Sequence, residues 1–190
     1  MRLLKPKEIK EYLDLLDLTT DIPTEFIPVK NERLFRTAVS QPGLRYAQAE
    51  AFIRQPLLDE QFQSISAADR GWAAERILDE IKGRMMEDIV LLETKMSKPG
   101  KQVFRLQFPI GEYDMVVVDP KTIECEIYEI KHSAERVPAQ YRFLEDTEKL
   151  ASVKFRYGRV KKKAVIYRGQ NTILNNGIEY LNVEDYLKSL

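Results

Sequence analysis

Four residues of this chain are of types that can do chemistry together. Glu87 lies in a stretch with helical spacing, Asp114 in a run of apolar residues, and Glu129 and Lys131 in a second apolar run. Convergent carboxylates repel one another unless a cation neutralises them or one of them binds a proton. Oxygen ligands with room for water suit Mg²⁺ or Mn²⁺. The set therefore predicts a metal-dependent reaction at a phosphodiester, with Lys131 as the cationic group.

The spacing of Glu129 and Lys131 is informative only because both residues lie in a segment with the pattern of a β-strand. Glu-x-Lys also occurs at residues 8–10, 80–82 and 93–95, all in helical patterns. Residues two apart share a face in a strand but not in a helix. Asp114, on the preceding strand, can lie across from Glu129 after a tight turn. Two carboxylates and a lysine then converge.

Hydrophobic periodicity predicts the elements that position these residues. A serine cap at Ser66 starts a long amphipathic helix, and the period changes to that of strands after Pro99 and Gly100. The expected elements are a helix over 66–96, strands over 102–108, 113–119 and 123–131, a helix over 140–155, a strand over 159–167, and a short strand over 178–181 followed by a helix over 183–190. This order predicts an α/β fold with one mixed sheet.

The first third of the chain is expected to be helical and irregular. Helical spacing covers residues 6–18, two prolines break the pattern within 19–28, and a further helix is expected over 44–55. The predicted organisation is a helical linker or extension over residues 1–65 and an α/β domain over residues 66–190.

Composition bounds the class of protein. The 190 residues are 44% hydrophobic and 32% charged, as in ordinary globular proteins, and 30 basic residues balance 30 acidic ones. The single Cys125 and the single His132 exclude an internal disulfide and a His/Cys zinc site of the usual spacing. No run is long enough to span a membrane and the first residues do not resemble a signal peptide. A cytoplasmic protein is expected.

A simpler interpretation of the acidic residues remains open at this point. Asp114 and Glu129 can be solvated residues on an exposed sheet face, with Lys131 as their salt-bridge partner. The apolar neighbours Val116 and Ile127 argue against full solvation, because charge inside such a run is costly without a partner.

The arrangement resembles the PD-(D/E)xK nuclease superfamily, whose core is an α-β-β-β-α-β unit with an acid on the first helix, an aspartate on the second strand and Glu-x-Lys on the third. Glu87, Asp114, Glu129 and Lys131 fill these positions. The segments Gly-Arg-Met-Met-Glu, Gly-Glu-Tyr-Asp and Glu-Ile-Lys-His-Ser also look like the carboxyl-terminal domain of a bacterial and archaeal family of AAA-type ATPases. The nuclease-like match covers about residues 66–170.

The resemblance implies a restriction-endonuclease-like fold and hydrolysis of DNA by metal-activated water. Asp114, Glu129 and the backbone carbonyl of Ile130 would hold Mg²⁺ or Mn²⁺, with Glu87 contributing directly or through water. Lys131 would orient the nucleophile or stabilise the developing negative charge.

The chain also departs from the family. It contains no Gly-x-x-x-x-Gly-Lys-Ser/Thr loop, so ATP binding is not carried over to these residues, and a fragment of a longer ATPase or a stand-alone relative is expected. Many superfamily members carry an assisting glutamine or tyrosine in the helix after the third strand, where this chain has Gln140 and Tyr141. His132 follows the third strand and can touch a phosphate, or be an ordinary surface histidine.

Local positive charge is expected where a nucleic acid binds. Arginines at 33, 36, 45 and 54 dot the amino-terminal part, and a denser basic run comprises Lys154, Arg156, Arg159, Lys161, Lys162 and Lys163. Either set can contact phosphates. The alternative for the lysines is protection of an exposed edge strand against pairing with another chain.

Two functions of different class follow from the sequence. The first is a Mg²⁺-dependent DNA endonuclease domain that works with an ATPase module in a larger protein. The second is a nuclease-like domain without catalysis that docks DNA or a protein partner. Some superfamily members cut both strands as dimers, so a homo-oligomer also remains open.

Overall fold

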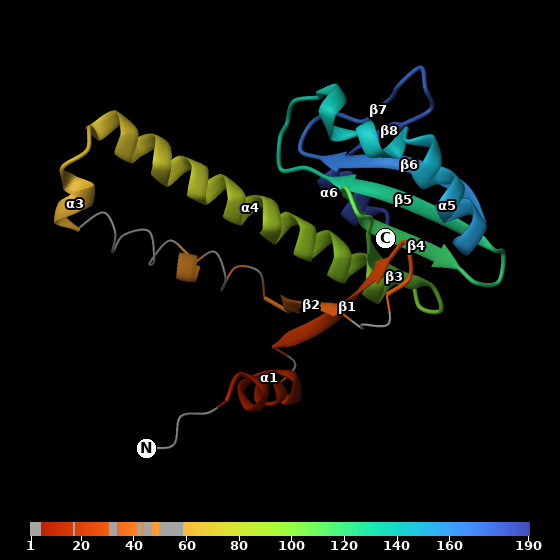
Figure 1. Cartoon of the computed structure of the whole chain (residues 1–190), viewed down its shortest axis with the longest axis horizontal. Helices are drawn as coiled ribbons and strands as arrows, with labels where there is room; N and C mark the ends of the chain where they lie inside the picture. Colours follow the sequence, from red (N-terminus) through yellow and green to blue (C-terminus); the bar gives the residue numbers. More distant parts are fainter. Residues whose placement is uncertain (1–4, 17, 31–33, 42, 44–46, 50–58) are drawn as a thin grey trace.

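The computed structural model describes residues 5–16, 18–30, 34–41, 43, 47–49 and 59–190. It is an α/β protein with a long helix and an eight-stranded mixed sheet, whose strand order is β2-β1-β3-β4-β5-β6-β8-β7 (Figure 1). None of the described helices is long and apolar enough to cross a membrane.

The long helix, α4 (Ala67–Ser97), begins where the sequence predicts it. The Ser66 hydroxyl accepts a hydrogen bond from the backbone N–H of Asp69 at 3.1 Å, which satisfies one of the donors left free at a helix start. Its last three turns pack on the sheet through residues such as Val90 and Leu91, which are fully buried. Its first half projects beyond the sheet, with the short helix α3 (Glu60–Gln63) at its far end (Figure 1).

The three strands after α4 form the predicted meander. β3 (Gln102–Gln107) pairs antiparallel with β4 (Glu112–Asp119), and β4 pairs antiparallel with β5 (Glu124–Ile130). β6 (Arg159–Tyr167) then lies parallel to β5. Both faces of these strands are buried, which is why their central residues are apolar in long runs and do not alternate with polar residues.

Two cores cover the two faces of the sheet. One face packs against α4 and α6 (Val183–Lys188). The other packs against α5 (Thr147–Tyr157) and two short 3₁₀ helices, Pro138–Gln140 and Arg142–Leu144. The helix expected over 140–155 is therefore split, because Asp146 caps a new helix start with hydrogen bonds from the N–H groups of Glu148 and Lys149.

The amino-terminal region contains two strands in addition to the expected helix α1 (Pro6–Leu15). β1 (Thr19–Phe26) pairs parallel with β3, and β2 (Leu34–Val39) pairs antiparallel with β1 at the edge of the sheet. The sequence predicts irregular chain over 19–28 because of Pro23 and Pro28, but β1 contains Pro23, and of its residues only Ile22 and Phe26 are buried. Most of the helix expected over 44–55 lies outside the described residues.

The carboxyl-terminal part completes the sheet. β8 (Glu179–Asn182), the short strand that the sequence predicts, lies parallel to β6. A two-residue strand that the sequence did not indicate, β7 (Thr172–Ile173), forms the other edge. β6 is thus an interior strand between β5 and β8. β8 pairs only with residues 164–167 of β6. Among the described strands, the part of β6 that carries Lys161, Lys162 and Lys163 has β5 as its one neighbour, so edge protection by these lysines stays a prediction.

Candidate active site

The register of β4 and β5 brings Asp114 and Glu129 face to face. Met115 of β4 pairs with Tyr128 of β5. Because the two strands are antiparallel, Asp114, which precedes Met115, lies opposite Glu129, which follows Tyr128. Each of these two acids is only 4% exposed. The convergence that the spacing predicts is confirmed, and the alternative of solvated carboxylates on an open sheet face is wrong.

A β-bulge in β4 sets the direction of Asp114. Phe104 pairs with Val116 whereas Leu106 pairs with Tyr113, so Arg105 alone opposes two residues of β4, Asp114 and Met115. Bulges locally disrupt pairing and redirect a side chain. Here the Asp114 carboxylate turns toward β5 and accepts a hydrogen bond from the backbone N–H of Ile130 at 2.7 Å. The main chain of β5 thereby fixes one of the two acids.

Lys131 lies between the two carboxylates. Its Nζ is 2.8 Å from Asp114 Oδ2 and 2.7 Å from Glu129 Oε2, and its side chain remains 33% exposed. Burial lowers the pKa of Lys131, but Asp114 and Glu129 outweigh it and raise the pKa above the ordinary value. One cation thus faces two carboxyl groups, and it can balance the charge of only one of them when both are ionised.

Glu129 is the less satisfied of the two acids. Among the described residues, no donor hydrogen-bonds to its buried Oε1. Burial raises the pKa of Glu129 well above 4.5, and the charge of Asp114 raises it further, whereas Lys131 lowers it. Such a carboxylate either holds a proton or awaits a second cation.

Glu87 is held by a residue that the sequence analysis did not place at the site. Arg36 reaches from β2 to α4, where its Nη1 lies 2.6 Å from Glu87 Oε2 and its Nε lies 2.7 Å from Asp88 Oδ1. Its Nη2 also donates to the carbonyl of Arg84 at 3.2 Å. Burial and the charge of Asp114 raise the pKa of Glu87, and Arg36 and Arg105 lower it in part. Arg36 therefore ties the edge strand to the predicted acid of the helix.

The structure brings the predicted metal ligands together only in part. Within the described ranges, no three His, Cys, Asp or Glu side chains form a group that could hold one ion. Asp114 and Glu129 form a pair, and Glu87 stays with Arg36 beside them.

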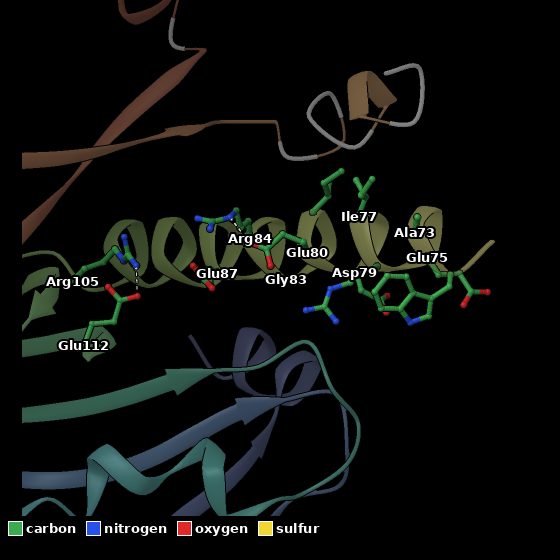
Figure 2. Close-up of a pocket in the computed structure, with 13 residues that line it drawn as sticks. Ala73, Glu75, Ile77, Asp79, Glu80, Gly83, Arg84, Glu87, Arg105 and Glu112 are labelled. Carbon is green, nitrogen blue, oxygen red and sulfur yellow. Dashed lines mark hydrogen bonds and ion pairs between the residues drawn. The ribbon is translucent and has the colours of Figure 1, made fainter. Parts of the chain in front are cut away.

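A groove opens next to Glu87, along α4. It has a volume of about 920 Å³ and its lining includes Trp72, Arg76, Arg84, Glu87, Arg105 and Glu112. Figure 2 shows Arg105 and Glu112 joined at the sheet end of this groove, with Glu87 on the neighbouring turn of the helix and Ala73 and Glu75 at the other end. This α4 groove leads to the side of the site where Glu87 lies.

The basic run lies away from the two carboxylates. Val165 is the β6 residue opposite Glu129, so the run lies toward the other end of β6 and in α5. Several of its members already pair with acids, namely Arg156 with Glu25, Arg159 with Glu124 and Lys162 with Glu179. Lys154, Lys161 and Lys163 complete the run. The structure does not bring this set to the candidate site.

The remaining candidates have local partners. The amide oxygen of Gln140 accepts hydrogen bonds from Val137 N–H at 3.1 Å and the Tyr180 hydroxyl at 3.0 Å, and its amide nitrogen donates to Glu135. Gln140 therefore holds the loop after β5, and Tyr141 packs edge-on against Tyr180.

His132 lies beside Arg168 at the end of β5. Its Nε2 is 3.4 Å from Arg168 Nη1. Burial lowers the pKa of His132, and the positive charges of Arg168 and Lys82 lower it further. A neutral imidazole is thus favoured at pH 7, so His132 contributes no positive charge toward a phosphate.

Neither Arg36 nor Arg105 is a site residue that the sequence predicts. Arg36 appeared only among scattered arginines, because no local pattern joins β2 to a helix that begins about thirty residues later. Arg105 carries one signal, a charge within the apolar alternation of β3, which is costly in a buried strand unless it has a partner.

Comparisons with protein families, with curated proteins and with solved structures give no match to this chain. The site must therefore be interpreted from its own geometry.

We expect Glu129→Gln to change the pH dependence of stability. The pKa of Glu129 in the folded protein lies above the ordinary 4.5. The contribution of Glu129 to the free energy of unfolding is therefore complete below pH 4.5 and is lost as pH rises through the folded pKa. Urea titrations between pH 3 and 8 give the unfolding free energies of the variant and the wild type. The value of the variant minus that of the wild type should grow with pH above 4.5, by up to about 1.4 kcal/mol per pH unit.

Glu124→Gln is the control with the opposite sign. A hydrogen bond from Arg159 lowers the pKa of Glu124, so its contribution is present above pH 4.5 and is lost as pH falls. A Glu129→Gln difference that stays flat across the range would show that Glu129 ionises normally.

We expect Arg36→Met to lower the unfolding free energy by about 2–4 kcal/mol, because it removes the cation between two acids, one of them buried. Arg84→Met is the matched control: Arg84 pairs with Glu80 on the same helix, but both are more than half exposed, and the expected cost is under about 1 kcal/mol. Equal losses in chemical denaturation would contradict a special role for Arg36.

Proposed function

We propose that this chain is a metal-dependent phosphodiesterase that acts on DNA, with a restriction-endonuclease-like fold of the PD-(D/E)xK type. The observation that carries the proposal is the buried pair of Asp114 and Glu129 with Lys131 between them. The element order α4-β3-β4-β5-α5-β6 supports it, because it is the order that the superfamily shares.

The residues present fit a divalent cation. Mg²⁺ in proteins is bound by one or two carboxylates, with water and substrate phosphates as the other ligands. Asp114 and Glu129 would supply these carboxylates, and the buried Oε1 of Glu129 has no hydrogen-bond donor in the described chain. The backbone carbonyl of Ile130 is the third candidate ligand. When bound, Mg²⁺ or Mn²⁺ would offset the charge of the phosphate and make water a stronger nucleophile.

The protein residues would orient the reactants. The hydrogen bond from Ile130 N–H holds the Asp114 carboxylate in place before any substrate enters. Lys131 is fixed between two acids but one-third exposed, so its ammonium can also donate to a phosphate oxygen or to the attacking water. Asp114 and Glu129 raise its pKa, which keeps the ammonium protonated at neutral pH and suits charge stabilisation.

Glu87 would act from outside the pair. Arg36 holds its carboxylate at the wall of the α4 groove, where it can bind through water or orient a substrate group. A role through water agrees with the absence of a three-carboxylate group among the described residues.

One observation favours the non-catalytic alternative. Lys131 contacts both acids and Arg36 contacts Glu87, so the protein itself neutralises much of the charge that a metal would. A nuclease-like domain that only docks DNA or a protein partner could keep such ion pairs for stability. An ATPase module in a larger protein, and assembly into a homo-oligomer, belong to the same set of proposals.

The proposal predicts that Asp114→Asn weakens Mg²⁺ or Mn²⁺ binding by about tenfold or more and abolishes cleavage, because one ligand loses its charge. Asparagine can still accept the Ile130 hydrogen bond, so the fold should persist. Calorimetric metal titration and cleavage of supercoiled and single-stranded DNA on the same samples give the measurement.

Asp119→Asn serves as the control, since Asp119 ends the same strand and pairs with Lys101 away from the site. It should bind metal and cut as the wild type does. Metal binding without cutting in the wild type would favour the docking function, and no binding at millimolar ion would contradict the metal site.

A further inference from the structure

Arg105 lies beside the candidate site without a role in the mechanism above. It is the one residue of β3 that opposes the bulge at Asp114 and Met115, so it sits across the strand pair from the fixed acid. Its side chain is 17% exposed and lines the α4 groove together with Glu87. A cation is thus present in the groove wall next to the carboxylates.

Of the two donors on one edge of the Arg105 guanidinium, only one has an acceptor among the described residues. Its Nη2 donates to Glu112 Oε1 at 2.8 Å, whereas its buried Nε has no acceptor among the described residues. Nε and Nη2 form the same edge of the guanidinium, the edge that binds both oxygens of a carboxylate or phosphate at once. A buried charged donor without an acceptor is costly, so this edge is better suited to a different oxyanion than to the present contact with Glu112.

The other two cations of the site are already committed. Lys131 contacts Asp114 and Glu129, and Arg36 contacts Glu87 and Asp88. Glu112, in contrast, is 38% exposed and can turn into solvent. Arg105 is therefore the cation that can change partners at least cost.

We propose that Arg105 is the phosphate-binding residue of the α4 groove, and that it exchanges Glu112 for a phosphodiester of the nucleic acid, which it holds through Nε and Nη2. In the protein without nucleic acid, the carboxylate of Glu112 pairs with the guanidinium of Arg105 in place of the phosphate. This inference rests on the proposed function, because it assumes a nucleic acid substrate.

The test is binding of fluorescein-labelled 12-nucleotide DNA, single-stranded and duplex, followed by anisotropy in EDTA over a range of salt concentrations. Arg105→Gln should weaken binding about tenfold and reduce the slope of log affinity against log salt by about 1. Glu112→Gln should tighten binding about threefold, because it frees the guanidinium from a competing charge. Charge alone gives such opposite signs near a polyanion, so the exchange predicts effects of both variants that clearly exceed those of the control pair Arg84 and Glu80.

Arg84→Gln and Glu80→Gln form the matched control, since these residues make an exposed ion pair in the same groove at 2.9 Å. Each should change affinity less than twofold. Arg105→Lys is the second variant, for the case in which Arg105→Gln does not fold. Lysine keeps the positive charge but lacks the Nε–Nη2 edge that binds two oxygens at once. This variant should still bind DNA several-fold more weakly than the wild type.

Three results would overturn the inference. They are no DNA binding by the wild type, an Arg105→Gln effect no larger than that of Arg84→Gln, and a Glu112→Gln variant that binds no more tightly. Because these assays contain no divalent ion, their outcome is separate from the metal titration of Asp114→Asn. DNA binding that depends on Arg105 in a protein that binds no metal would leave the inference standing and contradict catalysis.

Discussion

Two carboxylates that face each other across neighbouring buried strands must be compensated, and the local structure follows from this constraint. Lys131 compensates part of the charge, and the N–H of Ile130 supplies Asp114 with a second donor. The bulge in β4 makes the latter contact possible by turning Asp114 out of the ladder. Glu129 keeps an unsatisfied oxygen and a raised pKa, so the compensation is incomplete.

A second layer of ion pairs surrounds this centre. Arg36 connects the edge strand β2 to Glu87 and Asp88, and Arg105 connects β3 to Glu112. The Arg36 pairs join elements that are distant in sequence, whereas the Arg105–Glu112 pair joins two neighbouring strands at the sheet end of the groove. The β1–β2 hairpin is therefore more than an extension of the sheet, because it supplies the cation that fixes Glu87. A change at the amino-terminal hairpin is expected to be felt at the site.

The sequence predicts the core well where burial leaves a clear pattern. The helix over 66–96, the strands of the meander and the strand over 159–167 were confirmed within a few residues, and the two-residue rule correctly placed Glu129 and Lys131 on one face. These features depend on local periodicity, which a single sequence records.

Long-range features were not accessible in the same way. The buried residues of β1 are spaced by four, and Pro23 lies within that strand, so it did not look like one. The partner of Glu87 comes from a strand about fifty residues away, and the bulge that orients Asp114 depends on the register of β3. The interior place of β6 depends on the parallel pairing of β8. Such facts belong to topology, which local patterns do not encode.

We propose that Asp114 and Glu129 together bind one divalent cation, and that the ammonium of Lys131 balances part of their charge in the metal-free protein. The most direct measurement is a calorimetric Mn²⁺ titration of Lys131→Met against the wild type. The ammonium of Lys131 competes with a metal ion for the two carboxylates. We therefore expect Lys131→Met to bind Mn²⁺ about tenfold more tightly than the wild type. Weaker Mn²⁺ binding by Lys131→Met, or no binding by either protein, would contradict it.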